Sequence, residues 1–226
     1  MNSFLGIDIG QSSVKIVSIN KENGEKLVLD SIGEGRIQLT ENNQNDSEKK
    51  WVEFGKLIKT IIADNKIKNR NVVASLPENE VISRLVQLPP LKDSEIMDAL
   101  RFEAETFVPY PLDEVSLDYE IIEKDEIGRL SVFVIAAKNE LINSYIKLFK
   151  GLGLEMVALE SPAIAFRRVA RNNATIDRLV MLNIGEKYSD IFNINKGNVY
   201  FSRSLPVGGE SLTRAISLGL GLDLAS

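Results

Sequence analysis

Two stretches of this 226-residue chain share one strand-turn-strand pattern, at an offset of 175 residues. The first reads GIDIGQSSVKIV (residues 6–17) and the second reads LVMLNIGEKYSDIFNIN (residues 179–195). At that offset, six of the thirteen positions from Ile9 to Lys21 are identical, and the apolar rhythm is the same. Such internal similarity predicts a duplicated domain. The alternative is that two buried hairpins merely share a composition.

The turn of the first hairpin has the features of an anion site. Gly10 lets the backbone approach a ligand closely, and the N–H groups of Gln11, Ser12 and Ser13 can point into one concavity. Two such turns, one from each half of the chain, could clamp a polyphosphate. Taken alone, each motif is equally compatible with a plain turn.

Further phosphate and metal contacts are expected around the turns. Asp8 ends the first strand and could hold Mg²⁺ through water, while Lys15 offers a point charge to an outer phosphate. In the second half we expect Gly185, and Gly208 with Gly209 before a helix, to approach the phosphates. The structural alternative for Asp8 is a strand-end carboxylate that accepts backbone N–H bonds.

Composition excludes several kinds of chemistry. The chain has no cysteine and no histidine, so thiolate, imidazole and Cys/His zinc chemistry are absent. Its net charge is −5 and no run of Lys or Arg exceeds two residues, which disfavours nucleic acid and anionic membranes as partners. No segment approaches ~18 consecutive apolar residues, and the N-terminus lacks a signal-peptide pattern. We therefore expect a cytoplasmic protein.

Apolar periodicity and turn residues predict an α/β order of elements. Asn23-Gly24 marks a hairpin turn, residues 41–50 read as a loop with Ser47 as a helix cap, and Trp51 begins a helical apolar pattern. Asp93 is predicted to cap a helix that runs to Phe107. The predicted strands cover residues 4–10, 13–20, 26–34, 71–75, 80–88, 115–123, 130–137 and 154–159. A helix is expected over 139–150, ending at Gly151 and Gly153, and Ser161 is expected to cap another that begins at Pro162.

Several of these stretches resemble a known family. GIDIGQSSVKIV and LNIGEKYSDI resemble the two phosphate motifs of the actin-like ATPase superfamily, which includes actin, hexokinase and FtsA. ALRFEAETFVPYPLDEVSLDYEII, LESPAIAFRRVA and SLPVGGESLTRAI resemble the PilM family of type IV pilus assembly proteins over nearly the whole chain. The FVPYPLDEVSLDY part is the most specific to that family.

The resemblance implies an actin-like (ribonuclease H-like) α/β fold with an FtsA-type insertion. Residues 1–77 and 154–176 would form subdomain 1A, residues 78–153 the inserted subdomain 1C, and residues 177–226 the start of an incomplete subdomain 2A. It also implies an ATP- and Mg²⁺-binding scaffold that binds the N-terminal peptide of a PilN-like inner-membrane protein. Such a protein would be cytoplasmic and peripheral at the inner membrane, alongside other proteins of the pilus assembly platform.

Two departures from the family pattern qualify these expectations. The second phosphate motif usually begins with an aspartate, and Asn183 stands there, so we expect slow or undetectable hydrolysis and a gain in any residual rate from Asn183→Asp. The chain also stops at Ser226, before the adenosine motif of the family. It is therefore expected to be a fragment or a natural truncation that binds ATP poorly or not at all.

Two other functions remain as alternatives. An FtsA-like cell-division protein would share the fold, but that family carries a C-terminal membrane-binding helix that this chain lacks or has lost. A small-molecule kinase would need a second acid beside Asp8, and none is convincing.

The partner is expected on the segment after the predicted helix stripe. Ile96, Leu100, Ala104 and Phe107 share one face, from which Phe102 points away by about 120° at ~100° per residue. Glu103 falls near the apolar face and needs a donor. We expect Phe102, Glu103, Phe107 and Tyr110 to line a groove for the PilN-like peptide. The alternative is a rigid, well-packed helix exit.

Overall fold

The computed structural model describes residues 3–22, 26–37, 47–171 and 177–223. The chain divides into two compact units. Unit 1 comprises residues 1–77 and 140–160, and unit 2 comprises residues 78–139 and 161–226. The chain therefore passes between the units three times. The predicted turn at Asn23-Gly24 lies outside the described residues.

Unit 1 is built on a five-stranded sheet in the order β3-β2-β1-β4-β8. Strand β1 pairs antiparallel with β2 and parallel with β4, and β4 pairs parallel with β8. The meander, helix and returning strand predicted from the sequence are thereby confirmed. The strands are β1 (Ser3–Ile9), β2 (Ser13–Glu22), β3 (Lys26–Arg36), β4 (Asn71–Ser75) and β8 (Glu155–Glu160).

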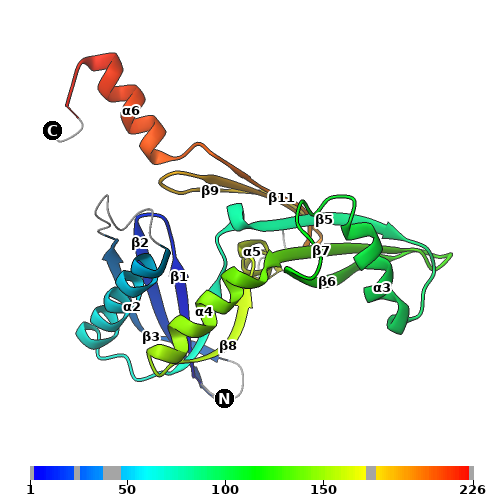
Figure 1. Ribbon diagram of the computed structural model, residues 1–226, viewed down its shortest axis with the longest axis horizontal. Coiled ribbons are helices and arrows are strands. Elements are labelled where there is room, and N and C mark those ends of the chain that lie inside the picture. The colour runs from blue at the N-terminus through cyan, green and yellow to red at the C-terminus, as the bar shows by residue number, and fades with distance from the viewer. Residues whose placement is uncertain (1–2, 23–25, 38–46, 172–176, 224–226) are drawn as a thin grey trace. The chain divides into compact units, whose positions relative to one another are not determined.

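The described residues of unit 1 include the helices α2 (Ser47–Asp64) and α4 (Asn139–Gly151) (Figure 1). Helix α2 packs closely on β3 because β3 carries glycine where they meet. A Cβ at Gly33 would lie 2.4 Å from Ile61, and one at Gly35 would lie 2.5 Å from Leu57. The prediction of a loop through residue 50 was wrong, since residues 47–50 form the first turn of α2.

Unit 2 contains two three-stranded antiparallel sheets. One has the order β5-β7-β6 and the other β11-β10-β9. A short 3₁₀ turn, η1 (Glu78–Glu80), precedes β5. The strands are β5 (Val81–Leu88), β6 (Val115–Lys124), β7 (Leu130–Lys138), β9 (Arg178–Ile184), β10 (Ser189–Asn195) and β11 (Asn198–Leu205), and the helices are α3 (Asp93–Ala104), α5 (Pro162–Arg171) and α6 (Gly209–Leu220).

Helix α3 covers the sheet β5-β7-β6 with the predicted stripe. Ile96, Leu100 and Ala104 are fully buried, and Phe107 packs at the edge of the same core. The helix boundaries were predicted wrongly. Lys92 is the N-cap, with its N–H bonded to the Glu95 carboxylate at 2.9 Å, so Asp93 lies inside the helix, which ends at Ala104. A loop of turns then leads to β6.

Helix α5 begins just after the chain re-enters unit 2 at residue 161, and it packs against both sheets of that unit. As predicted, Ser161 caps it: the Ala163 N–H donates to Ser161 Oγ at 3.1 Å, and Pro162 occupies the first helical position. The Phe166 ring packs on Phe192 of β10, with centroids 5.0 Å apart. Helix α4 also ends as predicted, with Gly153 at φ +67°.

The contacts of α4 bear on the predicted subdomains. Its Tyr145 ring packs on Trp51 of α2, with ring centroids 5.1 Å apart, and α4 is grouped with unit 1. The division into subdomains 1A, 1C and 2A stays a prediction.

Candidate functional site

The first hairpin turn is a tight connection closed by one hydrogen bond. The Gly10 N–H donates to the Ser13 carbonyl at 2.9 Å, and a Cβ at Gly10 would lie 3.1 Å from that oxygen. The Ile37 N–H donates a hydrogen bond to the Ser12 carbonyl at 2.7 Å. Within the described residues, no backbone carbonyl accepts from the N–H groups of Gln11 and Ser12. These two N–H groups can receive an anion.

The second hairpin has the same residue pairing and the same turn hydrogen bond as the first. All seven residue pairs of β1 and β2, from Ser3–Asn20 to Ile9–Val14, recur 175 residues later in β9 and β10. The Gly185 N–H donates to the Tyr188 carbonyl at 2.9 Å, and a Cβ at Gly185 would lie 2.9 Å from that oxygen. The repeated strand-turn-strand pattern is confirmed, and the duplication of a whole domain stays a prediction. Its turn residues Glu186 and Lys187 were not among the predicted site residues.

Gly208 and Gly209 fit the start of α6 against the second turn. The Gly209 N–H donates to the Gly185 carbonyl and the Glu210 N–H to the Glu186 carbonyl, both at 2.9 Å. A Cβ at Gly208 would lie 2.4 Å from the Glu186 oxygen. Two N–H groups of the helix N-terminus are therefore already bonded to protein. The phosphate role of this glycine pair stays a prediction, and close packing is a sufficient reason for Gly208.

Asp8 and Lys15 occupy facing positions next to the first turn. They are paired residues of β1 and β2, and both are exposed. One carboxylate that leaves room for water and phosphate oxygens suits Mg²⁺, which usually keeps several waters. Within the described part of the chain, no group of three or more acidic side chains could hold a metal alone. A metal at Asp8 would therefore rely on phosphate and water for its other ligands.

The corresponding rung of the second hairpin pairs Asn183 with Asp190. The Asn183 amide donates to Asp190 Oδ2 at 3.2 Å, and Ser204 Oγ donates to Asp190 Oδ1 at 2.6 Å. An aspartate at 183 would face Asp190 directly, as a like charge across the strands. The amide of Asn183 therefore has a structural role at this position, because it donates a hydrogen bond to the Asp190 carboxylate on β10.

A buried acid that the sequence did not reveal lies at the start of unit 2. Glu78 is 5% exposed and accepts hydrogen bonds from Ser161 Oγ, at 3.2 Å, and from Ser202 Oγ. Ser202 Oγ is also 2.7 Å from Ser83 Oγ. Burial, together with the charge of Asp190, raises the pKa of Glu78 to about 7, although its hydrogen bonds lower it.

The predicted partner residues are placed in different environments. Phe102 is 72% exposed and Tyr110 is 37% exposed, with the Lys138 amine 3.9 Å from the Tyr110 ring centroid. Glu103 is half-buried, and among the described residues no donor reaches its carboxylate. Phe107 instead packs against the core. The guanidinium carbon of Arg84 lies over its ring, 5.2 Å from the ring centroid of Phe107. Phe102, Glu103 and Tyr110 are thus available to a partner, while Phe107 supports the helix exit.

Comparison with known protein families identifies the chain. The family described as type IV pilus assembly protein PilM matches residues 6–225. The chain belongs to the PilM family. Among solved structures, the chain is similar to a PilM–PilN type IV pilus biogenesis complex, with a TM-score of 0.83 and 25% identity. The match covers 98% of this chain and 66% of the matched chain in that complex. This PilM-family chain therefore spans just under two thirds of the length of its relative.

Two more distant structures share the fold alone. The cytoplasmic domain of EpsL, an inner-membrane component of the type II secretion system of Vibrio cholerae, matches with a TM-score of 0.60 and 12% identity, over 99% of this chain and 77% of that one. The ethanolamine utilization protein EutJ from Carboxydothermus hydrogenoformans matches with a TM-score of 0.53 and 12% identity, over 100% and 59%. The PilM-family chain therefore has the actin-like α/β fold that the resemblance implied.

None of the helices in the described residues is both long and apolar enough to cross a bilayer.

Proposed function

We propose that this chain is an actin-like scaffold of type IV pilus assembly that binds the N-terminal cytoplasmic peptide of a PilN-like inner-membrane protein. The observation that carries the proposal is the match to a PilM–PilN complex over 98% of the chain. The scaffold would be cytoplasmic and held at the inner membrane by this partner. It would link the partner to the other proteins of the assembly platform.

The partner surface that we propose lies on unit 2, at the exit of α3. Phe102 extends into solvent from a helix whose other face is buried, and an exposed aromatic ring is a typical anchor for a peptide side chain. Half-buried Glu103 supplies an acceptor that can orient the peptide backbone or a basic side chain. Tyr110 offers a ring already held by Lys138. An apolar peptide with a donor group fits these three residues.

Fluorescence anisotropy with a labelled N-terminal peptide of the PilN-like partner tests this surface. Phe102→Ala and Tyr110→Ala should each weaken binding by roughly 1–3 kcal/mol. Ile127→Ala is the matched control, because Ile127 is 68% exposed in the β6–β7 turn and is not part of the proposed surface. Unchanged affinity in both folded variants would place the peptide elsewhere.

We further propose that the first turn binds the phosphates of Mg-ATP. Three features support this function: the N–H groups of Gln11 and Ser12, to which no backbone carbonyl of the described residues is bonded, exposed Asp8 and exposed Lys15. Hydrolysis should be slow. The chain has no histidine, and Asn183 cannot act as a base, which typically contributes 10²–10⁴-fold to a rate. A phosphate-release assay decides this, and turnover at ~1 s⁻¹ or more would contradict the proposal.

A further inference from the structure

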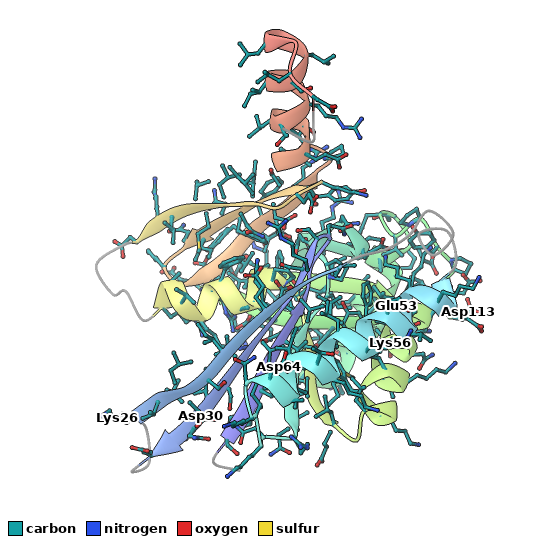
Figure 2. All side chains as sticks on the ribbon, turned by 90° about the vertical axis from the view of Figure 1, so that its left-hand side faces the viewer. Lys26, Asp30, Glu53, Lys56, Asp64 and Asp113 are labelled. Atoms are coloured by element: carbon teal, nitrogen blue, oxygen red, sulfur yellow. The ribbon has the colours of Figure 1, made fainter. Side chains whose placement is uncertain are left out.

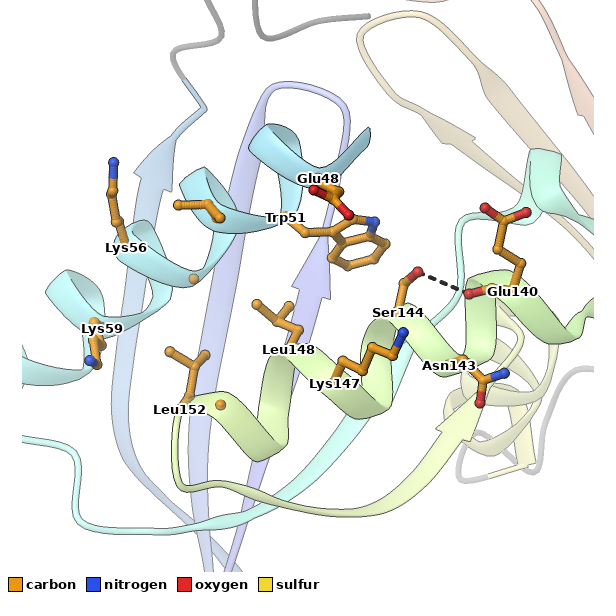
Figure 3. Close-up of a pocket in the computed structure, with 13 residues that line it drawn as sticks. Glu48, Trp51, Lys56, Lys59, Glu140, Asn143, Ser144, Lys147, Leu148 and Leu152 are labelled. Carbon is orange, nitrogen blue, oxygen red and sulfur yellow. Dashed lines mark hydrogen bonds between the residues drawn. The ribbon is translucent and has the colours of Figure 1, made fainter. Parts of the chain in front are cut away.

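Helices α2 and α4 of unit 1 enclose a groove that the proposed function does not use. It has a volume of about 690 Å³ and is lined by residues of these two helices and the turn after α4 (Figure 3). Its apolar part is formed by Trp51 and Val52 of α2 and by Leu148 and Leu152. Val52 is 56% exposed, so the groove presents apolar surface to solvent.

Glycine keeps the groove open. Gly55 of α2 lies against Leu148 and Leu152, whose methyl groups would be 3.4 and 3.8 Å from a Cβ at that position. Gly151 ends α4, and a Cβ there would meet nothing within 4 Å. A glycine in a helix is about 0.5–1 kcal/mol less favourable than alanine, so local helix stability does not explain Gly151. The empty space beside it is part of the groove.

The charges around the groove are arranged by the direction of the two helices. Trp51 contacts Tyr145, and Gly55 lies against Leu148, so residue numbers rise together and the helices run parallel. Glu48 and Glu140 therefore lie at the same end, near both helix N-termini. Lys147 follows one to two turns after Glu140, level with the apolar residues, and Lys59 lies farther on, towards the C-terminal end of α2 (Figure 3).

The two lysines carry uncompensated charge. Lys56, which also lines the groove, is bonded to Glu53 at 2.7 Å, and Figure 2 shows this pair on α2. Within the described residues, no carboxylate pairs with Lys59 or Lys147. The groove thus has an acidic end at Glu48 and Glu140, an apolar middle flanked by Lys147, and a basic end at Lys59. The distance from residue 48 to residue 59 along α2 is about 17 Å at ~1.5 Å per residue.

We propose that this groove binds an amphipathic helix of a partner protein, about three turns long, with a basic group at one end and an acidic group at the other. The apolar face of that helix lies on Trp51, Val52 and Leu148, as in other helix-in-groove complexes. Its acidic end meets Lys59, its basic end meets Glu48 and Glu140, and Lys147 flanks its apolar middle. An anionic membrane fits less well, because it would be repelled by these two acids. This inference is independent of the PilN-like peptide site on unit 2.

The sole tryptophan of the chain lies in the groove and reports on its occupant. The probe is a capped peptide of about twelve residues with leucines at helical spacing, two arginines at one end and two aspartates at the other. Binding should shift the Trp51 emission to shorter wavelength and saturate. A peptide with alanines in place of the leucines, and one with arginines at both ends, should each bind at least tenfold more weakly. No saturable shift with the first peptide would overturn the proposal.

Two matched pairs of variants locate the binding. Gly151→Leu should fill the groove without a clash and abolish the shift, whereas Gly219→Leu, at a helical glycine of α6 that also has nothing within 4 Å, should leave it unchanged. Lys59→Glu should weaken binding about tenfold, whereas Lys150→Glu, outside the groove, should change it less than twofold. Equal effects within either pair would contradict the site.

Anionic vesicles test the competing occupant. Phosphatidylglycerol vesicles should not sediment the protein, and they should not shift the Trp51 emission. If vesicles sedimented the parent protein but not Gly151→Leu, the groove would bind a membrane surface and not a peptide, and the proposal would be overturned. The unfolding temperature of each variant should be measured first, and Gly151→Leu is expected to be at least as stable as the parent because leucine favours the helix.

Discussion

Glu78 is the residue whose environment most affects how stability depends on pH. Its carboxyl has an ordinary pKa of 4.5 and a folded-state pKa of about 7. Between these values the folded protein holds a proton that the unfolded chain has released. The contribution of Glu78 is therefore most favourable at low pH, is lost as the pH rises from 4.5 to 7, and is constant above that. The hydroxyls of Ser161 and Ser202 can rotate to donate to the carboxylate or to accept from the protonated carboxyl.

We predict that Glu78→Gln flattens this dependence. The parent should lose up to about 3 kcal/mol of unfolding free energy from this group between pH 4.5 and pH 8, because each pKa unit corresponds to about 1.36 kcal/mol. The amide has no proton to lose, so the variant should lose much less. Urea unfolding at pH 5 and pH 8 measures both. Glu80→Gln, at the exposed neighbour, is the control, and an equal flattening there would exclude Glu78 as the cause.

Asn183 gives a second prediction at the residue scale. Asn183→Asp should lower the unfolding free energy at pH 7 by about 1–2 kcal/mol, since it removes a hydrogen bond and places a like charge opposite Asp190. Adding Asp190→Asn to that variant exchanges the two groups and should restore most of the loss. A double-mutant cycle in urea measures the coupling. Additive losses would show that the two side chains do not interact.

At the scale of elements, α6 depends on glycine where it meets the β9–β10 turn. We predict that Gly208→Ala costs about 1–3 kcal/mol, because its Cβ would lie 2.4 Å from the backbone oxygen of Glu186. Gly209→Ala is the matched change, since its Cβ would be 3.6 Å from the nearest oxygen and alanine favours the helix. Thermal unfolding of both variants tests the difference. A similar melting temperature for the two would contradict the packing.

At the scale of the whole molecule, every nucleotide contact that we propose is to phosphate or Mg²⁺. Mg-ATP and Mg-tripolyphosphate should therefore bind with similar, weak affinities, and Lys15→Ala should weaken both. Either ligand, at a concentration ten times its dissociation constant, should add about 1.4 kcal/mol to the unfolding free energy. Lys21→Ala, at an exposed lysine farther along β2, is the control. A clear preference for ATP over tripolyphosphate would require a base-binding surface that is not among these residues.

Local patterns in the sequence determined most elements and the repeated hairpin. Strand alternation, the Ser161 cap and the 175-residue offset each depend on residues close together in the chain or on direct self-comparison. The start of α2 was predicted wrongly, because a polar stretch such as residues 47–50 is equally compatible with a loop and with the first turn of a helix.

Tertiary structure alone decided where polar groups are buried and which surfaces stay open. Glu78 and Ser202 are 124 residues apart, so no local pattern marks their hydrogen bond or the raised pKa of the acid. The N–H groups of Gly209 and Glu210 are taken by carbonyls of another turn. The groove between α2 and α4 exists because two distant helices run parallel with glycines on their facing sides. Burial and electrostatics depend on distances through space, and the sequence by itself does not contain them.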